Sequence, residues 1–257
     1  MKDIYYESLK DARGTIFAET QHAYSSRLHF HRAFEVAYIL EGEANYTVEN
    51  ENFTAHAGDI VFTHCYYLHA GKKAPQHTKY VVAVPEKITS DIRRLFENDT
   101  LPVLLQDKEF NKTLLPHFEA LINQKEMSTT LTKGYSNIIF GSLASHYEKV
   151  PLKKKNKNVS IIENILNYID SHYNETITLE SISAHFGYNK NYFSRLFNEK
   201  IGMSLTNYIN MVRYDKFEKI YKNTDKNITE IVMECGFSSL PTFYRTQKIR
   251  NELKKEN

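Results

Sequence analysis

Four side chains in the first third of the sequence could together hold a ligand. His29 and His31 are separated by one residue, Glu35 follows soon after, and His69 lies farther along the chain. Side chains two residues apart on a strand share a face, so His29 and His31 would point the same way. Converging imidazole and carboxylate groups bind divalent metal ions or polar small molecules. We interpret these four residues as a ligand-binding set.

A second group of side chains, near the carboxyl end, has the types that read DNA. Arginine can bond guanine, and asparagine adenine, through paired hydrogen bonds. Such residues stand at outward positions of two short segments whose other face is apolar. Some of them would contact phosphate instead of bases. The predicted DNA-binding residues are Asn189, Lys190, Asn191, Ser194, Arg195, Thr242, Tyr244 and Arg245.

Each of these segments is the second half of a predicted two-helix unit. In the first unit Thr178 can cap one helix, Gly187 supplies a tight turn, and Asn189 can cap the next helix. The second unit repeats this layout, with Gly236 in the place of Gly187. Two short helices around a glycine turn are typical of a helix-turn-helix, whose second helix enters the major groove. A long helix predicted over 205–222 would space the two units.

A series of motifs runs from about Ser160 to Lys248. It consists of Tyr-Phe-Ser-Arg-Leu-Phe at 192–197, Gly202-Met203-Ser204 leading to Tyr208, Arg213, and Gly236-Phe237-Ser238-Ser239 with Phe243 and Arg245. In this series the region resembles the AraC-type transcription regulators. The resemblance implies a regulator of transcription that binds double-stranded DNA and forms a homodimer. If the protein is an activator, RNA polymerase is a further partner.

The second unit departs from the family pattern in three places. Phe217 stands where a small residue is usual, which implies a repacked helix junction. Gln247 stands where an aromatic residue is usual, and the residues from Lys248 onward do not show the expected closing helix. We therefore expect the second unit, from Ile228 onward, to be the less stable of the two, with most DNA contact coming from the first. Tyr192, Phe193, Leu196, Phe197 and Phe243 are expected in the core.

The first eighty or so residues have the pattern of an all-β domain. Short apolar runs alternate with turn signals about every ten residues, as in a barrel or sandwich. Turns are predicted at 50–52 and at Gly58-Asp59. From about Pro85 the apolar spacing becomes helical.

The spacing around the first histidines resembles the first motif of cupin barrels. That motif is His-x-His, three residues, Glu, six residues and Gly, here from His29 to Gly42. His69 holds the last ligand position of the second motif, although His64 replaces its usual proline and Tyr66 its usual glycine. In AraC-type regulators such a barrel implies a small-molecule effector. Two alternatives stay open, a divalent-metal site and a barrel kept for folding or dimerisation.

Together these patterns predict an α+β chain with an N-terminal cupin-like β-barrel and a C-terminal all-α tandem helix-turn-helix domain. The barrel sensor domain is predicted at 1–84 and a helical dimerisation segment at 85–150. A polar, basic linker is predicted at 151–158. The DNA-binding domain is predicted at 159–257.

Composition limits the alternatives. There are 33 Lys and Arg against 31 Asp and Glu, so net charge alone does not indicate a nucleic-acid partner. No apolar run approaches the roughly 18 residues of a membrane helix, and the start lacks a signal-peptide core, so we expect a cytoplasmic protein without membrane contact. We predict no enzymatic activity, no cofactor and no bound metal. The two rival interpretations are a metal-dependent cupin enzyme with a vestigial DNA-binding domain, and a shortened regulator that inhibits full-length relatives by pairing with them.

Overall fold

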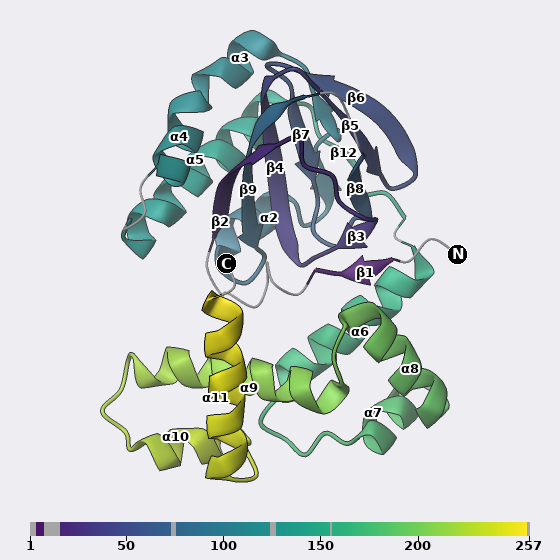
Figure 1. Cartoon of the computed structure of the whole chain (residues 1–257), viewed down its shortest axis with the longest axis vertical. Helices are drawn as coiled ribbons and strands as arrows, with labels where there is room; N and C mark the ends of the chain where they lie inside the picture. Colours follow the sequence, from purple (N-terminus) through teal and green to yellow (C-terminus); the bar gives the residue numbers. More distant parts are fainter. Residues whose placement is uncertain (1–3, 8–15, 73–75, 124–126, 155, 256–257) are drawn as a thin grey trace. The chain divides into compact units, whose positions relative to one another are not determined.

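The chain divides into two compact units, residues 1–159 and 160–257, which are described separately. The computed structural model describes residues 4–7, 16–72, 76–123, 127–154 and 156–255 (Figure 1). None of the helices in these ranges has the length and hydrophobicity needed to cross a bilayer.

The first unit is built on two five-stranded sheets, with strand orders β1-β3-β8-β5-β6 and β11-β7-β4-β9-β2. The predicted barrel-like β domain is therefore confirmed. The strands are β1 (Tyr5–Tyr6), β2 (Phe17–His22), β3 (His29–Phe30), β4 (Ala33–Glu41), β5 (Glu43–Val48), β6 (Glu51–His56), β7 (Ile60–Thr63), β8 (His69–Lys72), β9 (Thr78–Pro85) and β11 (Leu104–Leu105).

Strand β4 is buried on both faces, which explains its unbroken apolar run. One face, with Ala37 and Ile39, packs in a cluster with Tyr46 of β5 and Val61 of β7, so the two sheets enclose a common core. The other face carries Tyr38, whose ring lies 5.7 Å from that of Phe118. Because side chains alternate along a strand, Glu35 shares the inner face with Ala37 and Ile39.

Helices cover the outer face of the second sheet, where α4 contacts β2 and β9 (Figure 1). Segment 85–150, predicted as helical and separate from the barrel, lies in the same compact unit and also contains β10, β11 and the start of β12. The elements are α2 (Ser90–Leu95), β10 (Asp99–Thr100), α3 (Lys108–Thr113), α4 (Leu115–Asn123), α5 (Thr129–His146) and β12 (Val150–Pro151).

The hairpin between β5 and β6 turns one residue earlier than predicted. The turn residues are Glu49 and Asn50, and both have positive φ, at 45° and 70°. Val48 pairs with Glu51, so the loop has two residues, the length that favours a turn with φ above zero at both positions. The predicted turn at 50–52 is wrong by this shift, whereas Gly58, at φ 89°, lies in a turn as predicted.

The predicted linker at 151–158 is shorter in the structure. Pro151 belongs to β12 and pairs with Asp99 of β10. At the other end α6 begins at Lys157. Pro151, at the start of the predicted linker, therefore lies in a strand, and Lys157 and Asn158, at its end, lie in a helix.

The second unit contains two helix-turn-helix pairs separated by a long helix, as predicted. Thr178 caps α7 in a capping box, and Asn189 caps α8 through its side chain. Gly187 and Gly236 turn the chain between paired helices with φ of 70° and 83°. The helices are α6 (Lys157–His172), α7 (Leu179–His185), α8 (Lys190–Ile201), α9 (Leu205–Tyr221), α10 (Ile228–Glu234) and α11 (Leu240–Lys255).

The second helix pair has an apolar core of its own on α9. Phe217, noted as unusual in the sequence, packs at 4.5 Å between ring centroids against Phe243. Tyr214, Ile231 and Val232 are buried in the same cluster. The large residue at 217 therefore fills the junction between α9 and α11.

The residues after Lys248 extend α11 instead of forming a separate element. Arg250 is only 3% exposed and donates a hydrogen bond of 2.6 Å to Asp215 of α9. Gln247, at the position expected to be aromatic, donates to the Tyr214 hydroxyl at 3.4 Å. The end of α11 is thus held to α9 by hydrogen bonds from Gln247 and Arg250, at positions where the sequence pattern predicted a loss of apolar packing.

Candidate ligand site and nucleic-acid interface

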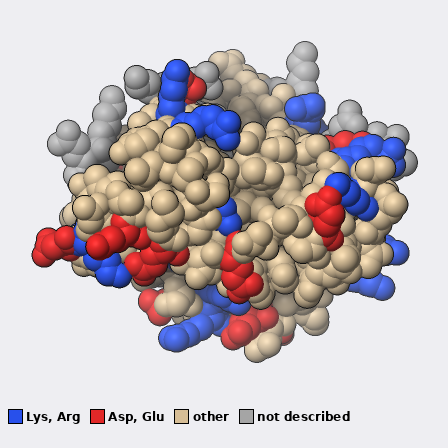
Figure 2. Space-filling view, turned by 90° about the horizontal axis from the view of Figure 1, so that it is seen from below, with Lys and Arg blue, Asp and Glu red and all other residues tan. Residues whose placement is uncertain are grey.

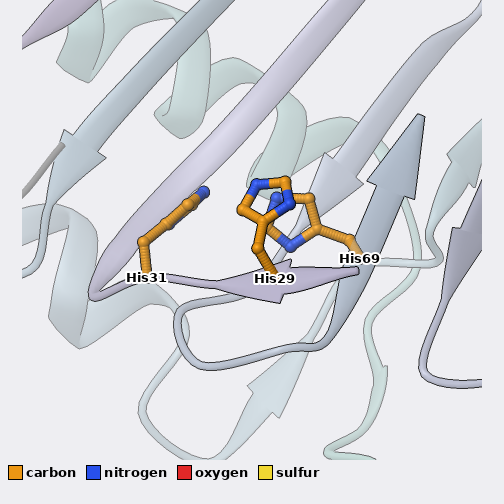
Figure 3. A group of neighbouring side chains, drawn as sticks. All are labelled: His29, His31 and His69. Atoms are coloured by element: carbon orange, nitrogen blue, oxygen red, sulfur yellow. The ribbon is translucent and has the colours of Figure 1, made fainter. Parts of the chain in front are cut away.

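The structure brings His29, His31, Glu35 and His69 together inside the first unit, as the sequence predicted. His29 on β3 and His69 on β8 are directly paired across the sheet. His31 lies between β3 and β4, and Glu35 lies on β4. All four residues are buried. Figure 3 shows the three imidazole rings on the same side of the backbone.

The three imidazole rings lie close together, and Glu35 lies beside two of them. The ring centroids of His29 and His69 are 4.1 Å apart, and those of His31 and His69 are 4.8 Å apart. The Glu35 carboxylate lies beside His31 and His69. Its Oε2 is 3.2 Å from Nε2 of His31, and its Oε1 is 3.9 Å from Nε2 of His69. One candidate ligand atom from each histidine lies within 4.8 Å of the other two, so one small ion or ligand group could touch all three.

Glu7 joins this site, although no sequence pattern identified it. Strand β1 pairs in parallel with β3, which places Glu7 Oε2 at 3.4 Å from Nε2 of His29. The Tyr5 ring stacks on the His29 imidazole, with 5.4 Å between centroids. A two-residue strand shows no periodicity, so only the long-range pairing reveals this contribution.

The barrel interior contains a further polar pair that sequence reasoning missed. Lys79 is 4% exposed, and its Nζ donates to the Tyr46 hydroxyl at 2.8 Å. Burial raises the pKa of Tyr46, and the charge of Glu35 raises it further. Tyr46 therefore stays a neutral phenol close enough to Glu35 to feel its charge.

In the first helix-turn-helix, the predicted DNA-binding residues differ in their availability. Asn191 and Arg195 are exposed on α8, and Ser194 is half-buried. The Asn189 side chain accepts the backbone N–H groups of Asn191 and Tyr192, so its oxygen is already used as a cap. Lys190 forms an ion pair with Glu180.

In the second helix-turn-helix, Tyr244 and Arg245 are exposed on α11. Thr242 is half-buried and its hydroxyl lies 3.0 Å from that of Ser239. One prediction about the core is wrong, because Tyr192 is 41% exposed whereas Phe193, Leu196, Phe197 and Phe243 are buried as expected. Tyr192 thus shares the exposed surface of α8 with Asn191 and Arg195.

The surface drawn in Figure 2 has no broad face on which only basic side chains gather. Lysine and arginine side chains are interspersed there with aspartate and glutamate. This agrees with the near balance of 33 basic and 31 acidic residues. Non-specific attraction to phosphate would be modest, so binding must depend on local contacts.

Comparisons with known proteins give one family match within each unit. The family described as AraC-like ligand binding domain matches residues 13–135, and the helix-turn-helix domain family matches residues 182–251. An uncharacterized HTH-type transcriptional regulator of Bacillus subtilis, YdeC, is 25% identical over 236 residues, covering 84% of this chain and 80% of that protein.

Two further proteins are similar to this chain. An uncharacterized HTH-type transcriptional regulator of Staphylococcus aureus, SAS0078, is 30% identical over 87 residues, which are 34% of this chain and 12% of that protein. Among solved structures, that of the AraC-like transcriptional activator CuxR has a TM-score of 0.47 at 12% identity, covering 86% of this chain and 82% of the other.

Proposed function

The chain belongs to the AraC-type family of DNA-binding transcription regulators, and on this basis we propose that occupancy of its ligand-binding domain controls how it binds DNA. The observation that carries the proposal is the buried group of His29, His31, Glu35 and His69 inside that domain. Burying four such polar side chains together is costly unless they bond one another or a ligand.

DNA would be read by the outward side chains of α8 and α11. Arg195 and Asn191 are exposed on α8 and have the donors and acceptors for base edges. Tyr244 and Arg245 take the corresponding place on α11. Asn189, Lys190, Ser194 and Thr242, which already have intramolecular bonds or are partly buried, are more suited to phosphate contacts or to holding the helices in place.

Assembly and location follow from the same role. We propose a homodimer in the cytoplasm, where the DNA is, and a contact with RNA polymerase if the protein activates transcription. The helices that cover the second sheet are candidates for the dimer interface, because α5 exposes Leu131 at 52% and Ile138 at 43%.

A genome-wide binding map of the full chain tests the proposed function. We expect discrete sites whose occupancy falls in an Asn191→Ala/Arg195→Ala variant and is retained in a Lys222→Ala variant, which removes an exposed charge beyond the end of α9. Binding spread evenly along the genome, or equal maps for the two variants, would contradict DNA reading by α8.

A further inference from the structure

Tyr192 lies at the edge of the exposed face of α8. The core side of this helix is formed by the buried side chains of Phe193, Leu196 and Phe197. Each residue advances about 100° around a helix, so Asn191 and Arg195 lie nearly opposite this core side. The same spacing places Tyr192 about 60° from Arg195, on the flank of the exposed face.

A recognition helix that lies in the major groove nearly fills it. The groove of B-DNA is about 12 Å wide, and a helix with its side chains is about 10–12 Å across. Side chains in the middle of the outer face therefore meet base edges, whereas side chains on the flanks meet the walls of the groove, which are lined by phosphates. When Asn191 and Arg195 face the bases, Tyr192 faces a wall.

The hydroxyl of Tyr192 is available for a contact with DNA. The side chain is 41% exposed, and within the described part of the chain its hydroxyl has no hydrogen-bond partner. The backbone N–H of the same residue donates to the Asn189 side chain at 3.4 Å, which helps to fix the first turn of α8. A phenol hydroxyl can donate a hydrogen bond without bringing a charge.

Tyr188 supports the ring of Tyr192. The two ring centroids are 5.6 Å apart. The Tyr188 ring in turn lies 6.5 Å from that of Phe193 in the core, and the Tyr188 N–H donates to the carbonyl oxygen of Ser183 at 2.8 Å. A side chain that is held in position before binding loses less entropy when it makes its contact.

At the corresponding position of the second recognition helix the hydroxyl already has a partner. Tyr192 is the third residue of α8, and Thr242 is the third residue of α11. Thr242 is half-buried, and its hydroxyl lies 3.0 Å from that of Ser239. The difference favours α8 as the helix that binds the groove wall at this position.

We propose that the Tyr192 hydroxyl donates a hydrogen bond to a phosphate oxygen at the wall of the major groove and thereby positions α8 on DNA. This inference rests on the proposed function, because it adds a residue to the same DNA interface. A phosphate contact carries no sequence information. A neutral hydroxyl also releases no condensed counterion, so this contact adds affinity without adding to the salt dependence of binding.

Tyr192→Phe tests the contact, because it removes only the hydroxyl. The full-length variant should bind every duplex chosen from the binding map about 10-fold more weakly than the wild type does. Its slope of log affinity against log salt concentration should equal that of the wild type, whereas loss of a lysine or arginine contact would reduce the slope by about one. Tyr221→Phe, at a tyrosine that is 49% exposed at the end of α9, is the matched control and should bind as the wild type does.

Duplexes that carry a single uncharged methylphosphonate identify the phosphate. We expect one position at which the substitution weakens the wild type but does not weaken Tyr192→Phe further, since the two changes remove the same bond. A variant that was merely less stable would remain as sensitive as the wild type at every phosphate.

Wild-type affinity in Tyr192→Phe would overturn the inference and leave the proposed function intact. Weakening confined to duplexes with a particular base pair would also overturn it, because Tyr192 would then read a base. Methylphosphonate sensitivity that is the same in Tyr192→Phe as in the wild type would exclude the phosphate bond. Absence of discrete sites in the wild-type binding map would instead remove the proposed function.

Discussion

The hydroxyl oxygen of Tyr67 accepts a hydrogen bond from the backbone N–H of Lys153 at 2.7 Å, although the two residues are 86 positions apart. The carbonyl oxygen of Tyr67 accepts from Nδ1 of His69 at 2.9 Å. One residue therefore bonds both a site histidine and the segment that follows β12. Lys153 is further fixed by an ion pair of 2.6 Å with Glu51.

Tyr67→Phe should separate ligand binding from the DNA response. The variant loses one hydrogen bond to Lys153, worth about 1 kcal/mol of stability, but keeps the carbonyl that orients His69. We expect ligand binding like that of the wild type and a smaller change in DNA affinity on ligand addition, measured by fluorescence anisotropy. Glu51→Gln, which weakens only the exposed ion pair of the same lysine, is the matched control. An unchanged response in Tyr67→Phe would exclude this bond as a route of coupling.

Arg195→Ala should weaken specific DNA binding by about 1–3 kcal/mol and relax the preference at one base pair. The guanidinium is exposed on α8, and the Glu199 carboxylate lies 4.0 Å away. This ion pair is weak, so the guanidinium can bond to DNA without losing a strong intramolecular partner. Binding to a set of single-base operator variants provides the measurement. Equal weakening on every sequence would identify Arg195 as a phosphate contact.

The second unit should bind DNA without the first. A fragment that begins at Asn156 keeps the side-chain oxygen that accepts the Asn158 N–H at 2.9 Å, just inside the start of α6. We expect this fragment, fused to a dimerising helix, to occupy the same sites as the full chain. The full-length His31→Ala/His69→Ala variant should likewise retain DNA binding but lose its ligand response. Failure of the dimerised fragment under conditions where the full chain binds would show that the units are not separable.

Hydrogen exchange should be faster in the second helix pair than in the first. The sequence predicts this from the departures at Gln247 and beyond, and the structure makes Arg250 a specific test. Arg250→Ala removes the bond to Asp215 and leaves a half-buried carboxylate without its cation. We expect faster exchange in α10 and α11 and little change in α7 and α8. Equal protection of the two pairs in the wild type would show that the bonds from α11 to α9 fully replace the missing apolar contacts.

Asp215 should make stability depend on pH. Burial raises the pKa of Asp215 from 3.8 to about 6, although the neighbouring Arg250 lowers it. A folded-state pKa above the unfolded value means that the carboxyl stabilises the fold most below about pH 4 and that this contribution is lost as the pH rises through about 6. Relative to Asp215→Asn, the wild type should lose about 1–2 kcal/mol across this range in urea unfolding. Asp225→Asn, at an exposed position, should show no such difference.

The parts of the fold that were predictable from sequence depend on contacts between near neighbours. Thr178 and Asn189 bond backbone groups two or three residues away, so their capping roles follow from local pattern. The paired histidines on one face follow in the same way from strand alternation. The register of the turn after β5 did not follow from local pattern, because Asn50 and Asn52 both tolerate positive φ, whereas the structure gives it to Glu49 and Asn50.

The features that sequence did not predict depend on long-range pairing. Glu7 reaches the site only because β1 pairs with β3, and Arg250 finds its partner 35 residues earlier on α9. A divalent-metal site stayed an open alternative in the sequence, because spacing alone does not show which nitrogen of each ring faces inward. The carbonyl partners of Nδ1 in His29 and His69 supply that information.

The two glycine turns of the helix-turn-helix pairs leave very different room for mutation. A Cβ at Gly236 would lie 2.7 Å from Cα and 2.8 Å from the carbonyl oxygen of Asn174, whereas a Cβ at Gly187 would meet no described atom within 4 Å. Asparagine, which tolerates positive φ, could therefore replace Gly187 at the cost of backbone strain alone. At Gly236 any side chain would also displace the chain at Asn174. The two copies of the motif therefore differ in how they can evolve. Single substitutions can be accepted at Gly187, whereas a substitution at Gly236 requires a compensating change in the backbone at Asn174.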